Sequence, residues 1–141
     1  MRLQSIISFS VLLVAEAVAQ APGSPVKNDV YTELAKAPVK AVSRRNPLEG
    51  DRDAVPAGAK LFELHCAECH GATADGGRKG PSLRAPEVQQ AAPGTLFWLL
   101  TNGVVRRGMP VWSKLPEPQR WQLVSYIKSL SAAPSDGDKA H

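Results

Sequence analysis

Two cysteines and a histidine stand close together in the segment Cys66-Ala67-Glu68-Cys69-His70. Two thiols three positions apart on one helical turn point to the same side of the backbone. They can bond to the two vinyl groups on one edge of a haem, and the adjacent histidine can then reach the iron. Because this spacing is typical of c-type haem attachment, we predict one haem c bound covalently through Cys66 and Cys69, with His70 as the proximal ligand.

An iron with six ligands needs a second side chain on the opposite face of the haem. Apart from Met1 the sequence contains one methionine, Met109, which lies between Gly108 and Pro110. These flanking residues favour a loop that approaches a ligand closely, and thioether sulfur commonly pairs with histidine on haem iron. We therefore predict Met109 as the distal ligand. His65, beside Cys66 on the proximal side, and His141, in a polar tail, are weaker candidates, and an empty distal site is the remaining alternative.

The first 19 residues have the pattern of a secretory signal peptide. Met1-Arg2 gives a positive start, Leu3 to Ala15 is largely apolar, and Ala17-Val18-Ala19 is an A-x-A cleavage site. An uncleaved anchor is the alternative, but the apolar run is shorter than the roughly 20 residues that span a bilayer. We therefore expect export to the periplasm and no spanning segment after cleavage.

The rest of the chain divides into three parts. Residues 20–54 contain four prolines and lack a sustained apolar period, so they are predicted to be a flexible leader. A short helix over Val30 to Ala37 is the alternative there. Residues 55–131 form the compact domain, which is large enough for one small core, and residues 132–141 form a short polar tail.

Three helices are predicted in the compact domain, over Pro56 to Cys69, Pro93 to Asn102 and Pro116 to Leu130. Prolines suit the helix starts, and Gly71 and Gly103 suit the ends of the first two helices. The third has apolar residues at every third position. No strand pattern competes, so the expected fold class is all-α, with about three main helices around the haem.

The charge pattern is mildly basic. The formal net charge is +4, which suits an acidic protein partner or an anionic membrane surface. No basic stripe with interleaved aromatic residues is present, so the composition does not favour nucleic-acid binding. The simplest interpretation of the basic residues near the haem motifs is a solvated rim, and the alternative is that Arg106 and Arg107 steer docking at the haem edge. The rim comprises Arg78, Lys79, Arg84, Arg106 and Arg107.

These residues together resemble the class I cytochrome c family over the compact domain. Gly58 and Phe62 match the small and aromatic positions of the family's N-terminal helix, and Leu123 and Tyr126 match their partners on the C-terminal helix. Gly80-Pro81-Ser82-Leu83 is similar to the loop in which a proline carbonyl, here that of Pro81, accepts a hydrogen bond from the proximal histidine.

The resemblance implies a fold, a cofactor and a function. It implies a small cytochrome c fold that carries one electron at a time in the periplasm, without catalysis of its own. The segment around Met109 and Trp121 is similar to bacterial cytochromes that serve periplasmic dehydrogenases. A monomer with redox protein partners is expected, or a subunit of a transient complex. A haem subunit of a dehydrogenase or oxidase complex is the first alternative; a haem enzyme or haem sensor with an open distal site is the second.

Overall fold

A computed structural model describes residues 29–132 of the chain. The predicted signal peptide and most of the predicted tail lie outside these residues. The described part is helical, with one isolated β-bridge and no longer strand. None of its helices is both long and apolar enough to cross a bilayer. In chain order the elements are η1 (Asp29–Lys36), α1 (Val39–Val42), α2 (Ala54–His65), α3 (Ala67–His70), α4 (Pro86–Gln90), α5 (Pro93–Asn102), η2 (Val105–Arg107), α6 (Glu117–Ser129) and η3 (Leu130–Ala132), where η marks a 3₁₀ helix.

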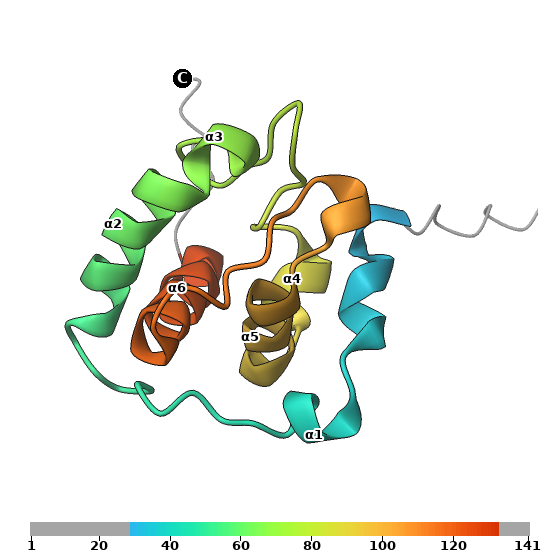
Figure 1. The fold of residues 1–141 in the computed structure, drawn as a ribbon. Coiled ribbons are helices and arrows are strands. Elements are labelled where there is room, and N and C mark those ends of the chain that lie inside the picture. Colours follow the sequence, from blue (N-terminus) through green and yellow to red (C-terminus); the bar gives the residue numbers. More distant parts are fainter. Residues whose placement is uncertain (1–28, 133–141) are drawn as a thin grey trace, which may run out of the picture.

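Helices α2 and α6, far apart in the sequence, pack closely against each other (Figure 1). A Cβ added at Gly58 would lie 2.0 Å from the carbonyl oxygen of Gln122, so only glycine allows the backbones to approach this closely. One turn later the rings of Phe62 and Tyr126 meet, with centroids 5.1 Å apart. The helix pairing implied by the family resemblance is therefore confirmed at these positions.

Helix α5 completes the core beside α6. Its bounds are those predicted from the sequence, and the rings of Phe97 and Trp121 stack with centroids 4.0 Å apart. The predicted apolar residues of α6 are confirmed as its inner side, since Trp121, Leu123 and Val124 are almost completely buried. This arrangement confirms the predicted all-α class.

The first predicted helix differs from the structure near the cysteines. The sequence predicts a continuous helix over Pro56 to Cys69, whereas α2 ends at His65 and a separate single turn, α3, begins at Ala67. Cys66 lies between them with φ −121° and ψ −33°, outside helical geometry. Phe62 before the break and Ala67 after it both pack in or against the core, so the apolar pattern continues across the break.

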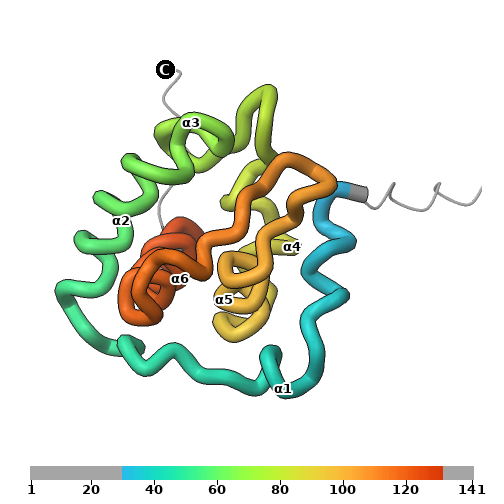
Figure 2. The backbone as a smooth tube through the Cα atoms, in the orientation of Figure 1, coloured from blue at the N-terminus to red at the C-terminus, as the bar shows by residue number. Residues whose placement is uncertain are grey.

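The predicted flexible leader also differs from the structure over residues 29–54. This segment runs around the edge of the domain, from beside the loop that carries η2 to the start of α2 (Figure 2). Tyr31, Leu34 and Leu48 pack against the core, and Ala41 is buried where Gly94 leaves room for its carbonyl. Within this segment, η1 corresponds to the short helix over Val30 to Ala37 that was the alternative prediction, and its apolar residues lie on one side.

Candidate haem site

The cysteine–histidine motif forms a tight turn at the end of α2. The Cys66 N–H donates to the carbonyl of Phe62, and the Cys66 carbonyl accepts hydrogen bonds from the N–H groups of Cys69 and His70. Gly71 ends the turn with φ +82°, a left-handed conformation that favours glycine. Both cysteines are unpaired and partly exposed, so their thiols remain available on one helical turn.

The imidazole of His70 is oriented by the loop that follows it. Its Nδ1 lies 2.8 Å from the carbonyl oxygen of Pro81, the contact that the family resemblance implies. Because a carbonyl can only accept, Nδ1 carries the proton and Nε2 is left with a lone pair for a metal. Gly80 lets this loop approach the ring, since a Cβ there would lie 3.0 Å from Nδ1. The histidine is therefore in the tautomer that an iron ligand needs.

Met109 is presented by a short closed loop after α5. Val104 and Met109 exchange two backbone hydrogen bonds, at 3.0 and 3.2 Å, around the η2 turn. Gly108 has φ +85°, and a Cβ at Gly103 would lie 2.7 Å from the Pro110 carbonyl oxygen. Both glycines are required by this geometry, so the loop holds the methionine in one place.

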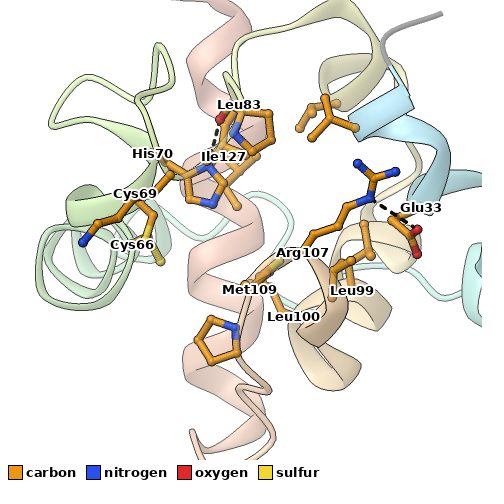
Figure 3. Close-up of a pocket in the computed structure, with 18 of the residues that line it drawn as sticks. Glu33, Cys66, Cys69, His70, Leu83, Leu99, Leu100, Arg107, Met109 and Ile127 are labelled. Atoms are coloured by element: carbon orange, nitrogen blue, oxygen red, sulfur yellow. Dashed lines mark hydrogen bonds and ion pairs between the residues drawn. The ribbon is translucent and has the colours of Figure 1, made fainter.

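A cavity of about 470 Å³ lies between these two loops (Figure 3). Its wall contains Cys66, Cys69 and His70 on one side and Met109 with Leu100 on another. Binding pockets for small molecules and cofactors typically measure roughly 300–1,000 Å³ and are mostly apolar. The cavity, its two thiols, the oriented imidazole and the thioether together fit a haem attached to the cysteines.

The thiol of Cys66 lies in an environment that disfavours its charged form. Burial, followed by the neighbouring Cys69, raises its pKa to about 11. The side chain is therefore a neutral thiol at physiological pH before any bond forms. A neutral, apolar surrounding is suited to a thioether, which carries no charge.

The basic residues around the site are mostly exposed, as the predicted solvated rim requires: Arg78, Lys79, Arg106 and Arg107 all face solvent. Arg106 and Arg107 both pair with the carboxylate of Glu33 in η1, with 3.8 Å between Arg107 Nε and Glu33 Oε1 (Figure 3). Lys79 pairs with Glu68 at 2.6 Å. Arg84 also pairs with Asp75, at 3.2 Å, so four of the five rim residues are ion-paired.

Two further residues on the cavity wall, Tyr31 and Glu33, were not predicted from the sequence. Tyr31 and Glu33 belong to η1 and were placed in the leader. Only the spacing of Tyr31 and Leu34, three positions apart as on one helix face, indicated a packed segment there. His65 also lines the cavity, and its ring lies tilted against that of Trp112, with centroids 5.2 Å apart.

The fold and the site together define a small c-type cytochrome domain. Residues 53–127 match the family model described as cytochrome c oxidase, cbb3-type, subunit III. This match covers more than half of the chain, and the chain belongs to this family. Family membership carries covalently bound haem c and a role in electron transfer rather than catalysis.

Similar proteins are found among subunits of redox complexes. The FixP subunit of the cbb3-type cytochrome c oxidase of Sinorhizobium medicae is 34% identical over 92 residues, covering 58% of this chain and 32% of FixP. The cytochrome c subunit of the cytochrome bc1 complex of Corynebacterium diphtheriae is 29% identical over 129 residues, covering 89% of this chain and 44% of the subunit. The chain thus spans less than half the length of these relatives.

A solved structure supports the fold independently. Cytochrome CL from the methylotrophic bacterium Methylophaga aminisulfidivorans is similar with a TM-score of 0.51 and 26% sequence identity. The likeness covers 59% of this chain and 57% of that protein. The shared part confirms the small cytochrome c fold.

Proposed function

We propose that this protein is a periplasmic one-electron carrier with a haem c ligated by His70 and Met109. It would pass electrons between a periplasmic dehydrogenase or a respiratory complex and an acceptor. The observation that carries the proposal is that His70 and Met109 line one cavity from two separate loops, each held by hydrogen bonds. The bound haem supplies an iron that takes up and releases one electron.

The residues of the site favour transfer without rearrangement. The Pro81 carbonyl fixes the His70 ring, and the Val104–Met109 bridge fixes the methionine backbone. Thioether ligation and an apolar wall both favour the less charged, reduced state of the iron. Two ligands held in this way keep the same positions in both oxidation states, which is what a carrier requires.

Export to the periplasm is supported by the sequence of residues 1–19. Their positive start, apolar stretch and A-x-A site are typical of a cleaved signal. Haem attachment to both thiols would also remove them from disulfide formation in an oxidising compartment.

The optical spectrum of the oxidised holoprotein tests the ligand assignment. We expect a methionine–iron charge-transfer band and no high-spin features. The band should be absent in Met109→Ala, whereas the haem should remain on the polypeptide after denaturation. A control variant, Val111→Ala, changes an exposed neighbour of the loop and should keep the band. A wild-type protein without the band would contradict Met109 as a ligand.

A second candidate function is that of a haem subunit within a larger redox complex. The names of the relatives favour it, because the FixP protein and the bc1 cytochrome c are both subunits of such complexes. Affinity purification of the full chain from its native host separates the two candidates. A stable, stoichiometric complex would support the subunit, and a protein recovered alone would support the free carrier.

A further inference from the structure

The η1 helix, Asp29–Lys36, lies outside the family-matched residues 53–127 but forms part of the cavity wall. Val30, Tyr31, Glu33 and Leu34 all line the cavity. The helix packs against both α4 and α5. It is therefore a component of the site that the family domain itself does not contain.

One end of η1 contacts the loop that orients the proximal histidine. The hydroxyl of Tyr31 donates to the Ser82 carbonyl, at 3.0 Å across 51 positions of sequence. Ser82 directly follows Pro81, whose carbonyl accepts the hydrogen bond from His70. Fixing the Ser82 carbonyl limits rotation of the backbone that holds the imidazole.

The next turn of η1 contacts the loop that carries Met109. Glu33 has only 12% of its side chain exposed, and its carboxylate pairs with both Arg106 and Arg107. These arginines form the η2 turn inside the Val104–Met109 bridge. Two adjacent guanidinium groups repel each other, and the carboxylate between them offsets that repulsion. The carboxylate thus ties the distal loop to η1.

We propose that η1 is a clasp that holds the proximal and distal ligand loops at a fixed separation, with Tyr31 and Glu33 as its positioning residues. This inference rests on the proposed function, since it takes His70 and Met109 as the ligands. Neither clasp residue touches the iron. Their role is to keep Met109 on the iron against competing ligands.

Carbon monoxide binding to the reduced holoprotein tests the clasp, because carbon monoxide binds only when Met109 leaves the iron. In Glu33→Gln, which keeps the side-chain shape and removes the charge, we expect carbon monoxide to bind faster by roughly tenfold. In Tyr31→Phe, which removes only the hydroxyl, we expect a smaller acceleration. In the double variant the acceleration of carbon monoxide binding should be smaller than the product of the two single accelerations, because loss of either contact already loosens the helix.

A matched control separates the clasp from general loosening of the N-terminal segment. Glu117 pairs with Arg44 of the same segment at 2.7 Å but does not line the cavity. Glu117→Gln should leave carbon monoxide binding unchanged, even if it lowers the unfolding midpoint. Glu33→Asp, which retains the charge, should bind carbon monoxide at a rate between those of the wild type and Glu33→Gln.

The outcomes distinguish failure of the clasp from failure of the ligand assignment. If the wild type shows the methionine–iron band but Glu33→Gln and Tyr31→Phe bind carbon monoxide at the wild-type rate, the clasp is wrong and the carrier stands. If Glu117→Gln accelerates binding as much as Glu33→Gln, the clasp is also wrong. A wild type that lacks the band and binds carbon monoxide at once overturns both.

Discussion

The α2–α6 crossing and the N-terminal segment, residues 29–53, stabilise the same domain by different means. At the crossing, Gly58 lets two backbones touch while Phe62 and Leu123 are removed from water. The N-terminal segment buries fewer apolar side chains, and polar contacts such as those of Tyr31 and Glu33 also tie it to the domain. The crossing thus contributes buried apolar area, whereas the polar contacts of the segment reach the two loops of the site.

This difference has an energetic basis. Burial of apolar area contributes in proportion to area, and a large aromatic side chain contributes a few kcal/mol. A hydrogen bond or exposed ion pair contributes about 1 kcal/mol or less. Substitutions at the crossing should therefore lower the free energy of unfolding strongly. Substitutions in the segment should lower it less, and those in η1 should change how firmly Met109 is held.

The largest expected effect is that of Gly58→Ala. The new Cβ would meet the Gln122 carbonyl oxygen at 2.0 Å and the Tyr126 Cβ at 2.8 Å, and the former is backbone that cannot turn aside. We expect a loss of about 3 kcal/mol in the free energy of unfolding of the holoprotein, measured by denaturant titration. Lys60→Ala, an exposed change on the same helix, should cost no more than about 0.5 kcal/mol. Equal stability of Gly58→Ala and wild type would contradict the close approach of α2 and α6.

A smaller effect is expected from Asn46→Ala in the N-terminal segment. The Asn46 amide donates to the Ser125 hydroxyl at 2.8 Å, and its oxygen accepts from the Leu48 N–H at 2.9 Å. Loss of these two hydrogen bonds should lower the free energy of unfolding by about 1–2 kcal/mol, measured by denaturant titration. The methionine–iron band should not change, because Asn46 does not line the cavity. The control is Asn102→Ala, which removes one exposed hydrogen bond. Loss of the band in Asn46→Ala would show that the whole segment, and not η1 alone, holds the ligands.

The smallest effect is the pH dependence of the Glu33 contact. A hydrogen bond from Lys36, aided by Arg106, lowers the pKa of the Glu33 carboxyl. Because the pKa of Glu33 is lower in the folded protein, the stabilisation from its ionised carboxylate is complete above the unfolded pKa, about 4.3. It is lost as the pH falls through the folded pKa. The charged groups that face Glu33 are Lys36, Arg106 and Arg107.

The difference between the rates at which the wild type and Glu33→Gln bind carbon monoxide should follow the titration of the Glu33 carboxyl. It should be constant from about pH 8 to about pH 5 and should shrink below about pH 4. Taking the difference removes the titration of groups that both proteins share. A difference that vanishes already near pH 6 would show that another group controls the distal loop.

The sequence predicted the crossing better than the segment. The helix Pro93–Asn102 and the buried side of α6 follow from a helical period and glycine stops, which are local signals. The four site residues Cys66, Cys69, His70 and Met109 could likewise be predicted from their types and spacing, and the structure places all four on the wall of one cavity. The contacts of Tyr31 and Glu33 could not be predicted in this way. Tyr31 contacts Ser82, 51 positions away, and Glu33 contacts Arg106, 73 positions away, so no local pattern signals either contact.

The break at Cys66 was missed for a related reason. The backbone turns there because the Cys66 carbonyl accepts from both Cys69 and His70, and no residue type in the motif signals a helix end before Gly71. The paired state of Arg106 and Arg107 was missed because their acidic partner, Glu33, lies 73 positions before Arg106 and only the fold brings it near. Discrete polar contacts therefore mark the limit of pattern-based prediction in this chain.

The most direct test of the central claim is a reductive titration of the full holoprotein followed by its optical spectrum. We predict one reversible one-electron transition of a low-spin haem, with the methionine–iron band present whenever the protein is oxidised and no carbon monoxide bound by the resting reduced protein. High-spin oxidised haem, or immediate binding of carbon monoxide by the reduced wild type, would contradict a carrier with His70 and Met109 both on the iron.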